Sequence, residues 1–195
     1  AGADRIVTVD LHAGQIQGFF DIPVDNLFAT PIFARHIKKR LNKKNLICVA
    51  PDVGGVERTR ALARKLDIGI AIIDKRRPAP GKSQVMNVIG NVKNKTCIIV
   101  DDIIDSAGTL CNAAVAIKKK GAKDIAAYIT HGVFSDKAIA RISKSPITKL
   151  VVTDSIDPIQ SIKNSTKISV LSVAPLLSEA IQRISTEKSV SVLFD

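Results

Sequence analysis

The sequence contains few aromatic residues, which limits how its core can be built. It has no Trp and one Tyr, and aromatic residues make up 4% of its 195 residues, whereas hydrophobic residues make up 46%. The core therefore has to consist of Ile, Val, Leu and Ala, as in α/β folds with nearly continuous apolar strands. The length suffices for one substantial core, or for one domain and part of another.

Long apolar runs and a disulfide framework are also lacking. No run approaches the ~18 apolar residues of a membrane span, and the sequence has no recognisable signal peptide. The three cysteines (Cys48, Cys97 and Cys111) are odd in number and unrelated in spacing, and the first two lie in apolar strand patterns. They are predicted to be reduced and not to form disulfides or ligate metals. We therefore expect a cytoplasmic protein with no membrane partner.

Acidic residues are scarce relative to basic ones, with 18 Asp and Glu against 29 Lys and Arg and a net charge of +11. Such an excess raises nucleic acid as a partner. The basic clusters at 35–40 and 118–120 lie on helical patterns, however, where a solvated polar face is the ordinary explanation. No zinc finger, recognition-helix pattern or aromatic stacking platform accompanies them. We expect no nucleic-acid function.

Apolar strand patterns alternate with amphipathic helical patterns along the chain. Strands are expected at 5–9, 46–50, 69–73, 84–89, 96–100, 125–130, 150–153, 168–170 and 189–194. Helices are expected at 30–41, 56–66, 108–120, 135–142 and 174–184. This rhythm predicts the α/β class, with a doubly wound, mainly parallel sheet that binds ligands at the carboxyl ends of its strands.

The most informative segment is 97–110, where an apolar strand leads through carboxylates and small residues into a helix. Ser106, Gly108 and Thr109 can surround a phosphate with N–H groups and hydroxyls at the positive end of the helix. A capping turn explains one carboxylate, but not Asp101, Asp102 and Asp105 together. Carboxylates can accept hydrogen bonds from sugar hydroxyls. The segment therefore predicts a phosphosugar site.

A second loop, at 50–58, places paired glycines between an expected strand and helix, where N–H groups can approach an anion closely. Asp52 in this loop could hold Mg²⁺. Taken alone, the loop would be a tight turn with a capping Asp. Its expected position beside the segment 97–110 favours a shared site for a sugar phosphate and a diphosphate.

Two further features are expected at strand ends. A Pro- and Gly-containing loop at 75–83 begins with Lys75, Arg76 and Arg77. Such loops are usually exposed and mobile, but cations here could close over charge that develops in phosphoryl transfer. Lys75 and Arg77, two residues apart, are the predicted catalytic pair. His12 could be a Mg²⁺ ligand, a phosphate contact, a proton shuttle or a structural residue, and its chemistry alone does not decide among these.

Four blocks of the chain resemble the ribose-phosphate diphosphokinase family, which has the type I phosphoribosyltransferase fold. The first block, 1–27, includes AGADRI, DLHA and QGFFDIPVDNL, and the second, 49–60, includes PDVGGVERTR. The third is Lys75–Arg77, and the fourth combines 87–90 with 97–110. The resemblance implies Mg²⁺-dependent transfer of the β,γ-diphosphoryl group of ATP to the C1 hydroxyl of ribose 5-phosphate. The products would be phosphoribosyl diphosphate and AMP.

The resemblance also implies a role for each matching position. The implied metal ligands are His12 and Asp52, and the implied catalytic cations are Lys75 and Arg77. The implied ribose 5-phosphate residues are Asp101, Asp102, Asp105, Ser106, Ala107, Gly108 and Thr109. Regulation by phosphate or nucleotides is implied near Gln17, Asp25, Asn26, Ser189 and Ser191. The usual assembly of the family is a hexamer.

The resemblance implies that most of an N-terminal domain, which supplies much of the ATP site, is absent from this sequence. Residues 1–30 are expected to be the end of that domain, 31–184 the second phosphoribosyltransferase-like domain, and 185–195 a terminal strand or tail. This part alone is expected to bind ribose 5-phosphate yet turn over poorly or not at all.

Three other functions explain the sequence less well than the diphosphokinase does. A non-catalytic regulatory homologue would depart from the family at the catalytic loop, whereas Lys75–Arg77 and the carboxylates of 101–105 are intact. A phosphoribosyltransferase would not explain the blocks at 19–27 and 51–60. A basic anion-binding protein would explain the charge and none of the motifs.

Overall fold

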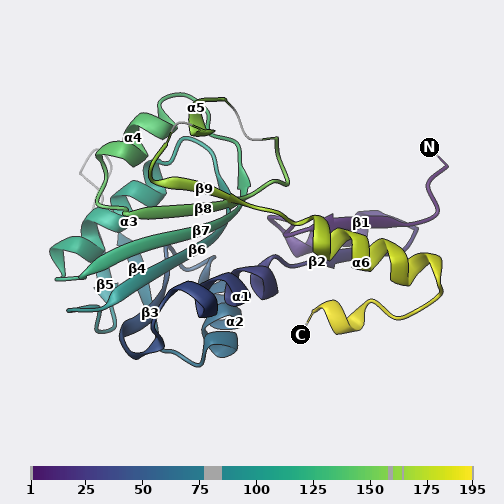
Figure 1. Ribbon diagram of the computed structural model, residues 1–195, viewed down its shortest axis with the longest axis horizontal. Coiled ribbons are helices and arrows are strands. Elements are labelled where there is room, and N and C mark those ends of the chain that lie inside the picture. The colour runs from purple at the N-terminus through teal and green to yellow at the C-terminus, as the bar shows by residue number, and fades with distance from the viewer. Residues whose placement is uncertain (1, 77–84, 158–159, 164, 195) are drawn as a thin grey trace.

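The fold is built on a seven-stranded sheet (Figure 1). The computed structural model describes residues 2–76, 85–157, 160–163 and 165–194. The strand order is β5-β4-β3-β6-β7-β8-β9, and every pairing is parallel except that of β4 with β5. The strands are β3 (Leu46–Ala50), β4 (Ile70–Arg76), β5 (Val85–Ile89), β6 (Thr96–Ile104), β7 (Asp124–Gly132), β8 (Lys149–Thr153) and β9 (Ile168–Leu171). The predicted fold class is confirmed.

Helices cover both faces of this sheet (Figure 1). One face carries α1 (Thr30–Arg40) and α2 (Val56–Leu66), and the other carries α3 (Gly108–Lys119) and α4 (Ala138–Lys144). The short α5 (Gln160–Lys163) precedes β9, and a 3-10 turn, η2 (Lys43–Asn45), precedes β3. Within the described residues, no helix is long and apolar enough to cross a membrane.

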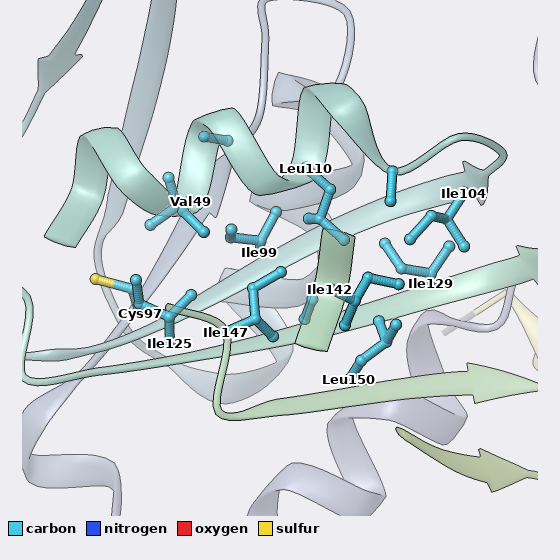
Figure 2. Packing of buried hydrophobic residues seen from close by; sticks show 14 of the residues in the cluster. Val49, Cys97, Ile99, Ile104, Leu110, Ile125, Ile129, Ile142, Ile147 and Leu150 are labelled. Carbon is cyan, nitrogen blue, oxygen red and sulfur yellow. The ribbon is translucent and has the colours of Figure 1, made fainter. Parts of the chain in front are cut away.

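Aliphatic side chains fill the space between the sheet and α3, as the composition predicts. Figure 2 shows Leu110 of α3 and Ile142 of α4 packed against Ile99 and Ile129 of the central strands. Cys97 belongs to the same cluster and is fully buried. Burial raises the pKa of its thiol to about 12, so the thiol stays protonated and acts as a small apolar residue.

A smaller lobe contains the first and last described segments of the chain (Figure 1). The parallel strands β1 (Ile6–Val9) and β2 (Val24–Leu27) flank a 3-10 helix, η1 (Gly14–Phe19). The helix α6 (Ala174–Ser185) and the 3-10 turn η3 (Ser191–Leu193) pack against this strand pair through an apolar cluster. The cluster contains Leu27, Leu176, Ala180 and Leu193. The domain boundaries expected at 30 and 184 remain a prediction.

The predicted terminal strand at 189–194 is wrong. The alternation of Ser and Val suggested a strand, but the segment turns as η3, with the Leu193 N–H donating to the Val190 carbonyl at 2.9 Å. Val190 is buried, and Leu193 packs against the small lobe. The burial of Val190 and the packing of Leu193 decide the conformation here, because an alternating pattern alone does not provide a partner strand.

Two strand extensions change where predicted site residues lie. β4 continues to Arg76, because it pairs with β5 in an antiparallel register that joins Lys75 to Met86 and Arg76 to Val85. Lys75 therefore lies in a strand and not in a loop. β6 continues to Ile104, because β7 pairs with it as far as Gly132. Asp101 and Asp102 consequently lie inside β6 and not after its end.

Candidate functional site

A cavity of about 560 Å³ opens where β3 and β6, neighbours in the sheet, reach their carboxyl ends. It brings together the two loops that the sequence predicted to be neighbours. The loop after β3 contributes Asp52, Gly54 and Gly55, and the first turn of α2 contributes Arg58. The β6–α3 junction contributes residues 101–110. His12, which follows β1, and Ile129 of β7 complete the lining.

Arg58 links the two carboxylates of β6. The pairing of β3 with β6 extends to Val49 and Ile99, so the Asp101 and Asp102 side chains lie beyond it, near the first turn of α2. The Nη1 atom of Arg58 donates to Oδ1 of Asp101 at 3.3 Å and to Oδ1 of Asp102 at 3.2 Å. Sequence reasoning did not single out Arg58. The available signal was a cation in the first helical turn after Gly54 and Gly55.

Asp102 also holds His12. Its side chain is 3% exposed, whereas that of His12 is 80% exposed, and the His12 Nδ1 atom lies 2.7 Å from Asp102 Oδ2. Burial by itself raises the pKa of Asp102, but the hydrogen bond from His12 and the charge of Arg58 outweigh it and lower the pKa below its ordinary value. Asp102 is therefore a charged acceptor with a protein partner on each oxygen.

Asp101 has the opposite electrostatic character. Burial, a hydrogen bond with Asp102 and the charge of that neighbour raise the pKa of Asp101 to about 7. Arg58 opposes this shift only in part. Two carboxylates at one site commonly divide in this way, because ionising both places like charges close together.

Replacing Asp101 by asparagine is expected to stabilise the fold more at ~pH 8 than at ~pH 5. Between its ordinary pKa of 3.8 and about 7, the folded protein binds this proton and the unfolded chain does not. The contribution of Asp101 to stability therefore falls as the pH rises through this window. Asn keeps the Oδ1 acceptor and removes the titration. The gain should be larger by about 1–2 kcal/mol at the higher pH, measured by urea unfolding.

The control is Asp105→Asn, which removes an exposed carboxylate from the same junction. An equal pH dependence in both variants would contradict burial as the cause.

The β6–α3 junction is shaped for an anion. Ala107 adopts a left-handed conformation (φ 62°) that turns the chain into α3, which then begins at Gly108. The first N–H groups of this 12-residue helix, near Thr109 and Leu110, lie at the cavity and carry the positive end of the helix dipole. The Nη1 atom of Arg141 in α4 donates to the Ser106 carbonyl at 2.6 Å and supports the junction from outside. Sequence reasoning missed Arg141, which has no local signal.

Asp52 connects the glycine loop to β4. Its Oδ1 accepts the N–H of Gly55 at 3.0 Å, and its Oδ2 lies 3.2 Å from the Nζ atom of Lys75. The predicted catalytic lysine is not among the residues that line the cavity, but it contacts the predicted metal ligand, which is. The other predicted cation, Arg77, lies outside the described residues.

The predicted Mg²⁺ donors fit an open site. The described residues contain no group of three or more His, Cys, Asp or Glu side chains that could hold a metal ion. His12 and Asp52 nevertheless line the same cavity. Mg²⁺ commonly keeps several waters and is bound by one or two carboxylates together with substrate phosphates. The residues present therefore fit an ion completed by water and substrate and do not fit an all-protein cage.

The predicted effector residues belong to the small lobe. Asp25 and Asn26 lie on β2, where Asp25 pairs with Arg5 at 2.6 Å and buried Asn26 accepts from Thr8 and from the Leu11 N–H. Gln17 lies in η1. Ser189 and Ser191 follow α6, with their Oγ atoms 2.8 Å apart. Their regulatory role stays a prediction.

Comparison with known proteins identifies the family. Residues 76–195 match the phosphoribosyl synthetase-associated domain. The chain belongs to this family. It is 60% identical over 195 residues to ribose-phosphate pyrophosphokinase of Rhizobium meliloti (strain 1021) and to that of Agrobacterium fabrum (strain C58 / ATCC 33970). Both alignments cover 100% of this chain and 63% of the relative. The chain thus spans less than two thirds of the length of these relatives.

The fold of the family is also present in a solved relative. Phosphoribosylpyrophosphate synthetase from Mycobacterium smegmatis matches with a TM-score of 0.87 and 38% identity over 95% of this chain and 60% of that chain. The family and the fold that the sequence motifs indicated are therefore confirmed. The roles of the individual residues remain predictions.

Proposed function

We propose that this chain forms the pentose-phosphate-binding part of a ribose-phosphate diphosphokinase that acts in nucleotide biosynthesis. The observation that carries the proposal is the meeting of two loops in one cavity. One loop combines carboxylates with a helix N-terminus, and the other presents paired glycines. The names of the relatives at 60% identity support the same activity.

Ribose 5-phosphate would bind along the β6–α3 junction. Its phosphate would lie against the backbone at 106–109, where N–H groups and the helix dipole favour an anion. Ser106 and Thr109 would add hydroxyl donors. Asp101 and Asp105, which line the same cavity, would accept hydrogen bonds from the sugar hydroxyls.

In the proposed reaction, the C1 oxygen of the pentose forms a bond to the β-phosphorus of ATP. The bond from that phosphorus to the oxygen bridging it to the α-phosphate breaks, the hydroxyl proton is released, and AMP leaves. Negative charge grows on the bridging oxygen as this bond breaks. Lys75 would stabilise that charge, together with Arg77, because fixed cations are most effective where charge develops.

His12 and Asp52 would hold Mg²⁺, which neutralises phosphate charge when it is bound. The protein would also bind phosphate or nucleotide effectors near Gln17, Asp25, Asn26, Ser189 and Ser191. At full length it would form a homo-oligomer, most simply the hexamer of its family. A cytoplasmic location agrees with its free cysteines.

Calorimetry with ribose 5-phosphate, ribose and inorganic phosphate tests the substrate. The phosphosugar is expected to bind at least about tenfold more tightly than either part, because it engages both the carboxylates and the anion site. Thr109→Val should weaken its binding about 10–100-fold by removing a donor to a charged group. Thr166→Val, at an exposed turn, should change nothing. Equal affinity for phosphate and ribose 5-phosphate would refute the proposal in favour of a simple anion site.

A further inference from the structure

Asp102 combines two properties that set it apart in the cavity. It lines the cavity, yet its side chain is 3% exposed and both of its oxygens have protein partners. We propose that Asp102 is a positioning residue that holds His12 with Nδ1 protonated and Nε2 unprotonated, and does not contact the pentose itself. This inference rests on the proposed function and assigns to Asp102 a role different from the sugar contact implied by the family resemblance.

The hydrogen-bond partners determine the tautomer. Arg58 Nη1, which can only donate, uses Oδ1 of Asp102 at 3.2 Å. Oδ2 lies 2.7 Å from Nδ1 of His12, and an ionised carboxylate can only accept. Nδ1 therefore carries the proton, and in the neutral ring Nε2 keeps its lone pair. Hydrogen bonding of one ring nitrogen in this way is how proteins select the nitrogen that binds a metal.

Burial explains why the contact positions His12 and not Asp102. The His12 side chain is 80% exposed, so few packing contacts fix its ring. Asp102 is held by β6, by surrounding protein and by Arg58 from α2. A short hydrogen bond from an exposed ring to a buried carboxylate orients the ring. Asp102, 90 residues away in the sequence, therefore sets the orientation of the His12 Nε2 atom.

The neighbouring carboxylate provides the contrast. Asp101 is 23% exposed, and its Oδ1 atom accepts from Arg58 Nη1 and from the N–H of Asp102. It is therefore the more accessible of the two to a sugar hydroxyl. The two adjacent aspartates would thus have different roles. Asp101 would contact the pentose, and Asp102 would act through His12.

The substitution Asp102→Asn reverses the hydrogen bond without removing the side chain. Arg58 Nη1 can only donate, so an amide NH₂ facing it would place two donors together. The amide oxygen therefore faces Arg58, and the amide nitrogen faces Nδ1 of His12. An NH₂ group can only donate, so Nδ1 must become the acceptor and Nε2 must carry the proton. The variant should therefore show the opposite tautomer.

The readout is ¹⁵N NMR of histidine-labelled protein without added metal at ~pH 9, above the ordinary imidazole range. The chain has three histidines, and the His12 signals are those lost in His12→Asn. Wild type and the matched control Asp101→Asn should have the proton on Nδ1, and Asp102→Asn should have it on Nε2. A wild-type His12 with the proton on Nε2 would overturn the inference, whether or not the variant folds.

A binding experiment separates positioning from direct contact. In calorimetry, Asp102→Asn should weaken Mg²⁺ binding about 10–100-fold, while its affinity for ribose 5-phosphate without metal stays within about twofold of wild type. Asp101→Asn should weaken ribose 5-phosphate without metal. A tenfold loss of metal-free ribose 5-phosphate affinity in Asp102→Asn would refute the positioning role. If wild type bound no ribose 5-phosphate, the proposed function would fail, whereas the tautomer result would stand independently.

Discussion

Replacing Lys75 by methionine is expected to lower the turnover number about 100–1,000-fold in a protein that carries this chain at the full length of its relatives. The ammonium group lies 3.2 Å from the carboxylate of Asp52, which lines the cavity. Removal of one fixed group that stabilises developing charge typically has an effect of this size. Because the charge develops in the transition state, the KM for ribose 5-phosphate should change little. Steady-state measurement of AMP formation gives both constants.

Lys119→Met, which removes an exposed lysine of α3, is the matched control and should retain wild-type turnover. Lys75→Arg should recover part of the activity, since it restores the cation with a different shape. A turnover number for Lys75→Met within about threefold of wild type would remove Lys75 from the catalytic assignment, because a contribution below ~1 kcal/mol is too small for a transition-state cation.

Replacing Phe33 by alanine is expected to reduce the free energy of unfolding by about 3–5 kcal/mol. Phe33 is 1% exposed and packs between α1 and the sheet, where its ring meets Tyr128 edge-on at a centroid distance of 5.5 Å. Urea unfolding followed by circular dichroism measures the loss.

Phe33→Leu should lose less, because leucine retains most of the buried volume. Phe19→Ala serves as the surface control, since Phe19 is 86% exposed, and should stay within about 0.5 kcal/mol of wild type. A loss below ~1 kcal/mol for Phe33→Ala would mean that α1 contributes little to the core.

Much of the sheet could be predicted because each element carries its own pattern. The ranges predicted for β3 and α2, 46–50 and 56–66, agree with the structure. The local sequence pattern fails where contacts with another segment determine the secondary structure. Polar residues Asp74 and Lys75 gave no strand signal, yet they extend β4 because β5 pairs with them. The tail alternates like a strand, but Val190 is buried, Leu193 packs against the small lobe, and the segment forms a 3-10 turn.

The candidate site likewise has parts that the sequence predicts and parts that it does not. The glycine loop and the β6–α3 junction could be predicted, because strand, turn and helix signals follow one another within a few residues. Arg58 and Arg141 could not, because their partners lie 43 and 35 residues away in the chain. The contact of His12 with Asp102 spans 90 residues. Such contacts follow from strand order, which no local motif specifies.

Three residues at and just after the end of β1 join the small lobe to the main sheet. Asp10 accepts hydrogen bonds from Thr130 and from the N–H of Ala29, and the ring of His131 donates to the carbonyl of Val9. His12 reaches Asp102 two residues further on. A rotation of the small lobe relative to the main sheet would therefore move the end of β1. It would also change the orientation of the His12 imidazole at the cavity.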